Sequence, residues 1–596
     1  MKRFLLVAGL GALIFSCANP TMRNLEDQTD QNAAAPRAVT SALTLNVNLS
    51  STIRGVTHCA SGSLYGVTES IPAEIGVLVA PLNPGVFTQP ARAGSSYQQP
   101  YGAAIPVAGR LTGTSGKVMI RLADICPNWP YSFPGMTIWL NQVKAVIADK
   151  KASGYSNFYG YEIWNEPCYT WNTANGTFNN LWSQTYAVIR ANDPGAKIIG
   201  PSEGYYNYTF MYNFLSYCKA NNCLPDILCW HELASNGGTG PSTVTASITS
   251  ARAIMSSLGI SEIPISINEY CNVNHAYEGA PGPSAPFIAK FERLKVDSAC
   301  ISWWWTAYPG RLGSILASNS ARGGGWWFYH WYGAMTGTMV SVTAPIEASS
   351  AVDGFACVDS SSKYASLCFG GENNGTVYVN FNNIPSWFGS YVRVVVEAAP
   401  WTNKDTPVYQ TALVSTSLKT VSSGKVSLTL TGLNSLYGYR ILLLPATSTS
   451  PIMLTSGNTY KVVNLNSGKC LGITNASTAP GALALQWGDN GTADHKWTIT
   501  LVNGYYRLKN VNSGLVLGIS DMSTADGGQA LQWSDNGTTD HDWTFTNTGS
   551  GIYKIANRNS GKSLAVLNMS SLDGGSVIQW SDYGTTDQRW VLVPAN

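Results

Sequence analysis

Short apolar runs alternate with amphipathic stretches over residues 42–338, the first of three zones that differ in hydrophobic pattern. The runs of strand length lie at 117–124, 158–165, 196–200, 226–231, 264–269 and 299–305. Buried strands that alternate with helix-like stretches are typical of a parallel sheet. With residues 53–59 and 74–79 in front, the zone holds eight expected strands over roughly 290 residues, the number that closes a (β/α)8 TIM barrel. An open doubly wound sheet is the alternative, but no Gly-rich phosphate loop follows the first strand.

Residues 339–447 change to a strict alternation of apolar and polar positions. The alternating runs lie at 376–381, 392–397, 426–431 and 439–444, with turn residues between them. Because side chains on a strand point alternately to its two faces, this period-two pattern indicates strands with one buried face. We therefore expect a β-sandwich after the barrel.

The last zone, residues 456–596, repeats itself. Gln-Trp recurs at 486–487, 532–533 and 579–580, a second Trp follows ten residues after each, and Asn-Ser-Gly opens each unit. Such a period predicts a three-lobed domain. The repeats resemble the ricin-type β-trefoil lectins, carbohydrate-binding module family 13. The resemblance implies that the Gln-Trp motifs are largely structural, with each Trp packing in a shared core.

The trefoil departs from the lectin pattern at one position in each lobe. Lectins of this family carry a sugar-binding Asp where this chain has Gly472, Gly518 and Ala565. The polar groups that could replace those carboxylates are Asp489, Asn490, Asp535, Asn536 and Asp582. We expect them to bind sugar hydroxyls; the alternative is a trefoil kept only as a spacer.

The N-terminus is typical of a targeting segment. Lys2 and Arg3 precede an apolar run that is too short to span a bilayer. The run ends in a small residue before Cys17, which resembles a bacterial lipobox and implies cleavage and acylation there. We expect residues 1–17 to be a lipoprotein signal, 18–41 a flexible tether, and the protein to be extracytoplasmic, held to the cell envelope through Cys17 or secreted. Ordinary signal cleavage is the alternative.

Composition narrows the class of partner. Only 12% of residues are charged and the formal net charge is +2. The sequence has no stretch of basic residues, so nothing in its charge indicates a nucleic-acid partner. The chain holds 20 Trp and 30 Tyr, whose ring faces pack on sugars or in a core. In an oxidising compartment the pairs 218/223 and 357/368 are candidate disulfides. No Cys or His spacing matches a metal site, and a monomer without cofactor is expected.

Two carboxylates end expected barrel strands. Glu166 lies in Trp-Asn-Glu-Pro after the fourth strand, and Glu269 follows Asn268 at the end of the seventh. Barrel active sites lie at the C-terminal ends of the strands, so both side chains are expected in one pocket. Two facing carboxyls roughly 5 Å apart suit retaining glycoside hydrolysis. The motifs resemble clan A of the glycoside hydrolases, most of all family 39, which places the acid/base on strand four and the nucleophile on strand seven.

The resemblance implies that Glu166 is the acid/base, Glu269 the nucleophile, and that Asn165 binds the sugar 2-hydroxyl. Further substrate-binding candidates are His231, His58, Arg121, Trp305 and Tyr206. Each could also be structural: His231 and His58 as satisfied polar groups, and Arg121 as part of an ion pair inside the barrel. Glu162 faces away from Asn165 and is set aside, and Glu203 is interpreted as a solvated loop carboxylate.

The sequence therefore predicts a retaining glycoside hydrolase of polysaccharides or their oligosaccharides, β-xylosidase-like or α-L-arabinofuranosidase-like. An endo-acting β-glycanase that cleaves xylan, glucan or mannan is the alternative within the clan. A non-catalytic carbohydrate-capture protein, with a degenerate barrel, is the alternative from another class.

Overall fold

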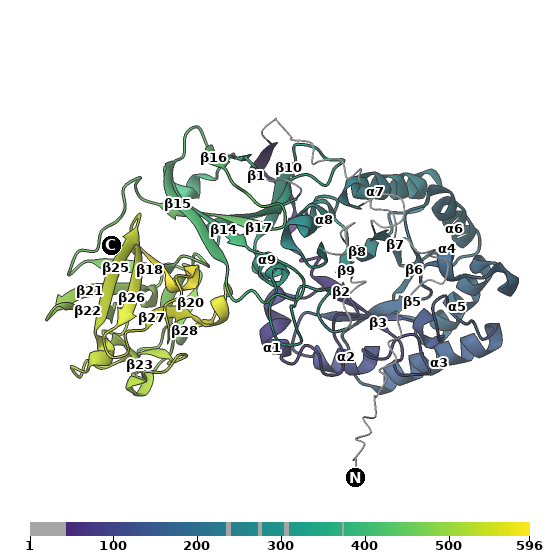
Figure 1. Ribbon diagram of the computed structural model, residues 1–596, viewed down its shortest axis with the longest axis horizontal. Helices are drawn as coiled ribbons and strands as arrows, with labels where there is room; N and C mark the ends of the chain where they lie inside the picture. Colours follow the sequence, from purple (N-terminus) through teal and green to yellow (C-terminus); the bar gives the residue numbers. More distant parts are fainter. Residues whose placement is uncertain (1–42, 234–239, 272–276, 303–308, 372–374, 596) are drawn as a thin grey trace, which may run out of the picture.

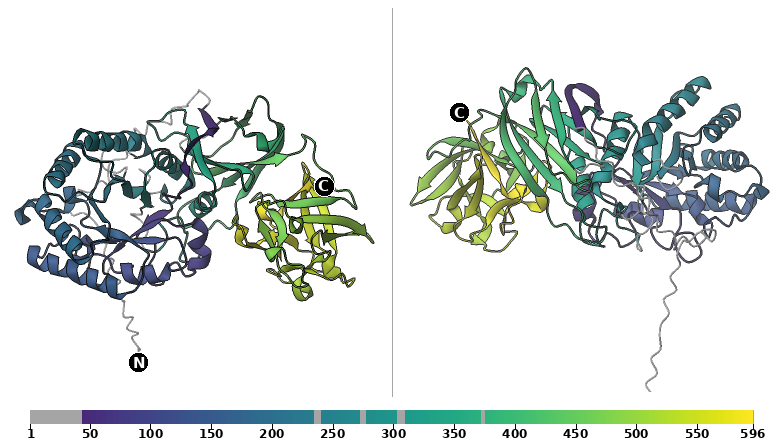
Figure 2. Two further views of the ribbon diagram at one scale, coloured as in Figure 1. Left: turned by 180° about the vertical axis from the view of Figure 1, so that it is seen from behind. Right: turned by 45° about the horizontal axis from the view of Figure 1, so that its top comes forward.

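A computed structural model describes residues 43–595, apart from 234–239, 272–276, 303–308 and 372–374. Figures 1 and 2 show a helix-covered barrel and a β-trefoil at opposite ends of the molecule, with a β-sandwich between them. The predicted multidomain fold of TIM barrel, sandwich and trefoil is confirmed.

The barrel is closed by eight parallel strands, each paired with the next. The strands are β2 (Gly62–Leu64), β3 (Val86–Pro90), β4 (Lys117–Arg121), β5 (Phe158–Glu162), β6 (Ile198–Glu203), β7 (Ile227–Leu233), β8 (Ile265–Cys271) and β9 (Ser298–Ile301). The α-helices of this region are α1 (Ile75–Leu78), α2 (Ala104–Arg110), α3 (Met136–Ala152), α4 (Pro167–Thr170), α5 (Phe178–Asn192), α6 (Tyr208–Ala220), α7 (Gly240–Ser257), α8 (Pro281–Arg293) and α9 (Gly324–Gly333).

The first two barrel strands differ from the prediction. The expected strand at 53–59 is the end of β1 (Leu43–Gly55), which belongs to the sandwich, and residues 74–79 contain α1. The true first strand, β2, has only three residues, and a Cβ on its Gly62 would lie 2.1 Å from the carbonyl oxygen of Val86. Such a short strand that requires glycine carries no apolar signal, so the sequence pattern missed it.

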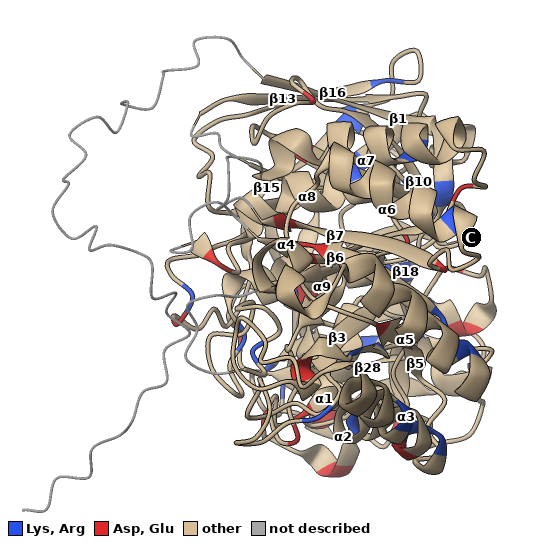
Figure 3. Ribbon diagram, turned by 90° about the vertical axis from the view of Figure 1, so that its right-hand side faces the viewer, with Lys and Arg blue, Asp and Glu red and all other residues tan. Residues whose placement is uncertain are grey.

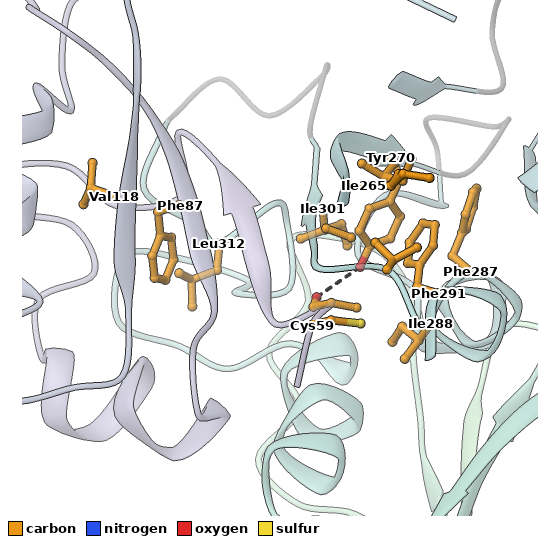
Figure 4. Close-up of a cluster of buried hydrophobic side chains, with 14 of the residues drawn as sticks. Cys59, Phe87, Val118, Ile265, Tyr270, Phe287, Ile288, Phe291, Ile301 and Leu312 are labelled. Atoms are coloured by element: carbon orange, nitrogen blue, oxygen red, sulfur yellow. Dashed lines mark hydrogen bonds between the residues drawn. The ribbon is translucent and has the colours of Figure 1, made fainter. Parts of the chain in front are cut away.

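Aromatic packing between β8 and α8 fixes the strand that carries Glu269. Tyr270 points outward, and its ring centroid lies 5.2 Å from that of Phe287 and 5.0 Å from that of Phe291 (Figure 4). Ile301 of β9 lies in the same cluster. Because neighbouring side chains of a strand point to opposite faces, this packing directs Glu269 into the barrel.

The sandwich is built from nine strands in one connected sheet whose apolar side chains share a buried core. Its strands are β1, β10 (Thr338–Thr343), β11 (Asp353–Asp359), β12 (Tyr364–Gly370), β13 (Val377–Asn382), β14 (Tyr391–Ala399), β15 (Ala412–Thr420), β16 (Val426–Leu430) and β17 (Gly438–Ala446). β1 pairs with β10 and β13. The chain therefore begins in the sandwich, passes through the barrel and returns.

The trefoil core contains the second Trp of each repeat rather than the Trp of the Gln-Trp motif. Trp497, Trp543 and Trp590 are fully buried, whereas Trp487 and Trp533 are 42% and 43% exposed. The implied core position of the motif Trp is therefore wrong. The motif glutamines are the buried members. The strands are β18 (Thr459–Asn464), β19 (Cys470–Ile473), β20 (Ala484–Trp487), β21 (Lys496–Val502), β22 (Tyr505–Asn510), β23 (Val516–Ile519), β24 (Ala530–Trp533), β25 (Trp543–Gly549), β26 (Ile552–Asn557), β27 (Ser563–Val566), β28 (Gly575–Trp580) and β29 (Trp590–Pro594).

Buried polar contacts join the trefoil to the sandwich. Arg440 of β17 pairs with Glu397 of β14, and its guanidinium also donates to the carbonyl oxygen of Asn466 at 2.9 Å. The other oxygen of Glu397 accepts a hydrogen bond from the Thr586 hydroxyl at 2.7 Å. Breaking such a buried network leaves charges unpaired, so the trefoil is held in a fixed position.

Charged side chains are scattered over a mostly uncharged chain, with no stretch of one sign (Figure 3). Among the described helices, none combines the length and hydropathy needed to cross a bilayer. The four cysteines of the two candidate disulfides are free thiols in this structure: Cys218, Cys223, Cys357 and Cys368. Burial raises the pKa of the Cys218 thiol, and a hydrogen bond with Cys223 raises it further.

Candidate active site

Glu166 stands where β5 ends and α4 begins. Its backbone is left-handed, with φ 50° and ψ 57°, and its N–H donates to the carbonyl oxygen of Ser202 at 2.8 Å. Pro167 then starts the helix, where its missing N–H costs nothing. This turn explains the Asn-Glu-Pro motif, because it directs the Glu166 side chain into the barrel mouth, where it is 3% exposed.

Glu269 faces Glu166 across the same space, with His231 between them. His231 of β7 is the register partner of Glu269. Its Nδ1 lies 3.2 Å from Oε1 of Glu166, and its Nε2 lies 3.6 Å from Oε1 of Glu269. One oxygen of each carboxylate lies within 4.8 Å of the other. The separation suits a retaining glycosidase, whose carboxyls stand about 5 Å apart.

Arg121 binds two buried carboxylates at once. Its Nη1 lies 2.7 Å from Oε1 of Glu269, and its Nε lies 2.8 Å from Oε2 of Glu162. The Asn268 amide also donates to Glu162 at 2.5 Å. Arg121 therefore forms the expected ion pair inside the barrel and also contacts Glu269; substrate binding by Arg121 stays a prediction. Glu162 lies behind the site and holds Arg121 in place.

The pKa of Glu269 is raised overall, because its charged neighbours only partly offset the effect of burial. Burial raises the pKa of Glu269, and the nearby Glu166 raises it further, while His231 and Arg121 oppose the rise. Burial lowers the pKa of His231, but the carboxylates of Glu269 and Glu166 outweigh it, so its pKa is raised overall. The positive charges of Arg121 and a protonated His231 beside Glu269 favour the ionised form of that carboxyl.

Two tyrosines and an aspartate extend this network, and the sequence pattern gave no sign of them. Nη1 of Arg121 also donates to the Tyr65 hydroxyl at 3.1 Å, and Tyr65 donates to Asp124 at 2.8 Å. Tyr131 donates to the other Asp124 oxygen at 2.9 Å. Burial raises the pKa of Asp124 to about 7. Asp124 and Tyr65 follow barrel strands, which is the one signal that could have found them.

Glu203 corrects the prediction of a solvated loop carboxylate. It ends β6 and is only 2% exposed. Burial raises its pKa to about 7, with a contribution from Glu166, although Cys168 donates hydrogen bonds to it from the thiol and the backbone. The carboxyl therefore lies at the start of α4, beside the acid/base candidate, and braces the helix that Glu166 begins.

The raised pKa of Glu203 makes stability depend on pH. A carboxyl whose pKa is higher in the folded state favours folding below its unfolded pKa, and that contribution is lost as pH rises through about 7. We expect Glu203→Gln to be neutral near pH 5 and to raise the free energy of unfolding by about 1–3 kcal/mol near pH 8. Urea unfolding at the two pH values measures this. Glu262→Gln, with a side chain 64% exposed, is the control; an equal effect of both variants at pH 8 would contradict the account.

Of the remaining barrel candidates, one lies in the site, one lies far from it and one is not described. Asn165 is buried beside Glu166, and its Oδ1 has no hydrogen-bond partner among the described residues. This oxygen is free to accept a hydrogen bond from a sugar hydroxyl. His58 is not in the site: it precedes β2 at the opposite end of the barrel, and its Nε2 lies 3.0 Å from the Met335 carbonyl oxygen. Trp305 lies outside the described residues.

Tyr206 has protein partners for both its hydroxyl and its ring, and substrate binding by it stays a prediction. Its hydroxyl donates to Ser250 of α7 at 2.8 Å, and its ring lies 5.2 Å from that of Trp230. Trp230 precedes His231 on β7 and points to the outer face, so Tyr206 packs between strand and helix.

The trefoil candidates hold turns in all three lobes. Asp489 pairs with Lys461 at 2.6 Å and accepts the Gly491 N–H at 3.1 Å, and Asn490 accepts the Thr492 N–H at 3.1 Å. The same contacts recur in the other lobes, where Asp535 pairs with Arg507, Asn536 accepts from Thr538, and Asp582 pairs with Lys554 and Arg589. These contacts explain the residues without a sugar, and sugar binding through them stays a prediction.

In two lobes a side chain at the lectin aspartate position would meet a buried histidine. A Cβ on Gly472 would lie 2.5 Å from Cδ2 of His495, and a Cβ on Gly518 would lie 2.4 Å from Cδ2 of His541. Each buried histidine fills the place where the side chain of an aspartate would start.

Similar proteins agree with this architecture. The structure of N2152 from Neocallimastix frontalis is 50% identical, covers 68% of this chain and 100% of that chain, and has a TM-score of 0.67. The chain belongs to the same family as N2152. A monomeric beta-xylosidase from Caulobacter crescentus CB15 shares the fold, at 15% identity and a TM-score of 0.50 over 68% of this chain and 100% of that chain.

In the C-terminal part of this chain, three overlapping segments match the family described as Ricin-type beta-trefoil lectin domain-like. They are residues 452–533, 496–580 and 539–596. The predicted fold of a barrel and sandwich with a C-terminal ricin-type trefoil is thus confirmed.

Two curated glycosidases are also similar in sequence. The 3-O-alpha-D-galactosyl-alpha-L-arabinofuranosidase of Bifidobacterium longum subsp. longum is 28% identical over 304 residues, 48% of this chain and 26% of that protein. The 3-O-beta-L-arabinopyranosyl-alpha-L-arabinofuranosidase of Bifidobacterium pseudocatenulatum is 25% identical over 513 residues, 74% of this chain and 50% of that protein. The chain spans about a quarter and half, respectively, of the lengths of these relatives.

Proposed function

We propose that the protein is a retaining glycoside hydrolase with Glu166 as acid/base and Glu269 as nucleophile. One observation carries the proposal: two buried carboxylates at the ends of barrel strands, with one oxygen of each within 4.8 Å of the other. In the first step Glu269 attacks the anomeric carbon while the Glu166 carboxyl protonates the departing oxygen. In the second step Glu166 takes a proton from water, which releases the sugar from Glu269 with its original configuration.

The surrounding groups suit these roles. Arg121 and His231 stabilise the ionised form of Glu269 in a buried site, so that it can act as a nucleophile. The unpartnered Oδ1 of Asn165 is placed to accept a hydrogen bond from the 2-hydroxyl, a contact that strengthens in the transition state. The chain's own residues supply the acid, the base and the nucleophile.

The names of the two curated relatives, both α-L-arabinofuranosidases, support an activity that is α-L-arabinofuranosidase-like or β-xylosidase-like. The test is hydrolysis of a panel of aryl glycosides and plant polysaccharides by the wild type and Glu269→Gln, with mass spectrometry of the products. Release of pentoses by the wild type alone is expected. Release of internal oligosaccharides from xylan, glucan or mannan would favour the endo-acting alternative, and glycan binding without any turnover would favour the capture protein.

The trefoil is proposed to bind polysaccharide and keep the barrel close to it. Because it is docked on the sandwich, it holds the bound chain at a fixed distance from the barrel. Affinity electrophoresis of Glu269→Gln in gels that contain polysaccharide measures binding without turnover. No retardation on any polysaccharide would leave the trefoil as a spacer.

We propose that Cys17 is acylated and anchors the protein to the cell envelope. The support is the apolar run of the first seventeen residues, which lie outside the described residues. Expressed in a bacterium with lipoprotein processing, the wild type is expected to incorporate labelled palmitate and to fractionate with membranes. Cys17→Ala should abolish both. A variant that keeps the label would contradict the assignment, and a wild type released as soluble protein would support ordinary signal cleavage.

A further inference from the structure

A pair of tyrosines stands beside Glu166 at the ends of two neighbouring barrel strands. Tyr169 lies on α4, three residues after Glu166, and Tyr205 follows β6. We propose that Tyr169 and Tyr205 form the subsite for the first sugar of the leaving group, so that the substrate is cleaved from another sugar rather than from a small aglycone. The inference rests on the proposed hydrolase function and deepens it.

Tyr169 is built as a platform. Its ring lies on the backbone of Gly204, where a Cβ would be 2.6 Å from its Cε2 and 3.1 Å from the Cys168 Sγ. Glycine is therefore required for the ring to pack there. The residue is 38% exposed, and the Tyr205 ring lies 6.2 Å away at 44°. An aromatic ring that is held by packing and partly exposed suits the C–H face of a sugar.

The phenol group of Tyr169 is part of the same electrostatic environment as the catalytic carboxyls. Burial of its hydroxyl raises the pKa of Tyr169, and Cys168, Glu166, Tyr205 and Glu203 raise it further. The hydroxyl therefore stays protonated and can donate a hydrogen bond. A platform with a donor next to the acid/base offers both stacking and one polar contact to a sugar.

The position of Glu166 decides which part of the substrate the platform receives. In double displacement the acid/base protonates the oxygen of the leaving group, so the leaving sugar lies on its side of the cleft. Tyr169 lies on α4, which follows β5, and Tyr205 follows β6, whereas Glu269 is on β8, two strands beyond β6. A second pair, Tyr208 and Tyr212 on α6, is 56% and 38% exposed, with rings stacked at 6.2 Å. This pair could support a longer leaving chain.

The test compares two substrates that differ only in the leaving group. One is an oligosaccharide from which the wild type releases its sugar, and the other is the fluoride of that same sugar, whose leaving group fills no sugar subsite. Tyr169→Ala and Tyr205→Ala are expected to raise KM for the oligosaccharide about tenfold and to leave the fluoride unchanged. Tyr169→Phe keeps the ring and should retain most of the affinity. Tyr378→Ala, a tyrosine of the sandwich that is 39% exposed, is the matched control.

Unchanged fluoride hydrolysis shows that each variant is folded and that its nucleophile works. Equal losses on the two substrates would assign Tyr169 a structural role, and an unchanged KM for the oligosaccharide would refute the subsite. A wild type that hydrolyses neither substrate would refute the proposed function, and the subsite with it. Activity of the wild type combined with an indifferent Tyr169→Ala would refute the subsite alone.

Discussion

Glu269→Ala should reduce turnover by roughly 10⁴-fold or more, because the variant lacks the group that forms the covalent intermediate. Sodium azide should restore part of the activity. The truncated side chain leaves space beside Arg121, whose Nη1 lies 2.7 Å from the Glu269 Oε1, and beside His231. A small anion can occupy that space, with both cations available to hold it, and attack the anomeric carbon directly.

The configuration of the azide product is the decisive measurement. A single displacement by azide inverts the anomeric carbon, whereas the wild type retains it through two displacements. Proton NMR of the glycosyl azide distinguishes the two. Glu269→Gln is the matched control, since it fills the space and should be as inactive without responding to azide. Near-normal hydrolysis by Glu269→Ala would remove Glu269 from the role of nucleophile.

The meeting of the two carboxylates in one site could be predicted because the residues follow a strong pattern. Buried strands four and seven are long enough to be seen as apolar runs; Glu269 lies near the end of β8, and Glu166 lies in the turn between β5 and α4. Parallel strands in a closed barrel bring such ends together, so the pairing followed from the topology alone. The trefoil fold could also be predicted, because the same sequence motif occurs once in each of its three lobes.

Supporting groups were harder to predict because their positions depend on contacts between distant segments. His58 lies in the expected strand at 53–59, but residues 53–55 end β1, which pairs with β10 and β13 in the sandwich, and His58 comes after it. Glu203 seemed to be a loop residue, but a shift in register between β6 and β7 at Pro201/Glu203 keeps it in the wall of the barrel. A pattern along one strand contains no information about such a shift.

Trefoil packing shows the same limit. The repeated Gln-Trp suggested a core Trp, yet the glutamines are buried, and Gln486 accepts a hydrogen bond from Ser467 at 2.6 Å. Its amide also donates to the Ser570 carbonyl oxygen of another lobe at 2.7 Å. The repeat is kept because this polar side chain ties neighbouring lobes together, which no single lobe reveals.

Glu166→Ala should give losses that depend on the leaving group. A poor leaving group such as a sugar hydroxyl needs a proton as the bond breaks, and losing the acid there should cost about 10²–10⁴-fold in kcat/KM. Fluoride and strongly acidic phenols leave without that proton, so kcat/KM for their glycosides should change little. The measurement is a series of aryl glycosides of graded phenol pKa, in which the variant's rates should fall steeply as the phenol becomes less acidic.

Two further results separate Glu166 from its neighbour Glu203. With a good leaving group the variant should accumulate the glycosyl-enzyme, because Glu166 is also the base for the second step, and azide should then yield a product with retained configuration. Glu203→Gln keeps the hydrogen-bonding shape beside Cys168 and should show no such dependence, since its carboxyl braces α4 instead of reaching the leaving oxygen. A uniform loss over the phenol series in Glu166→Ala, or the graded loss in Glu203→Gln, would move the acid/base role away from Glu166.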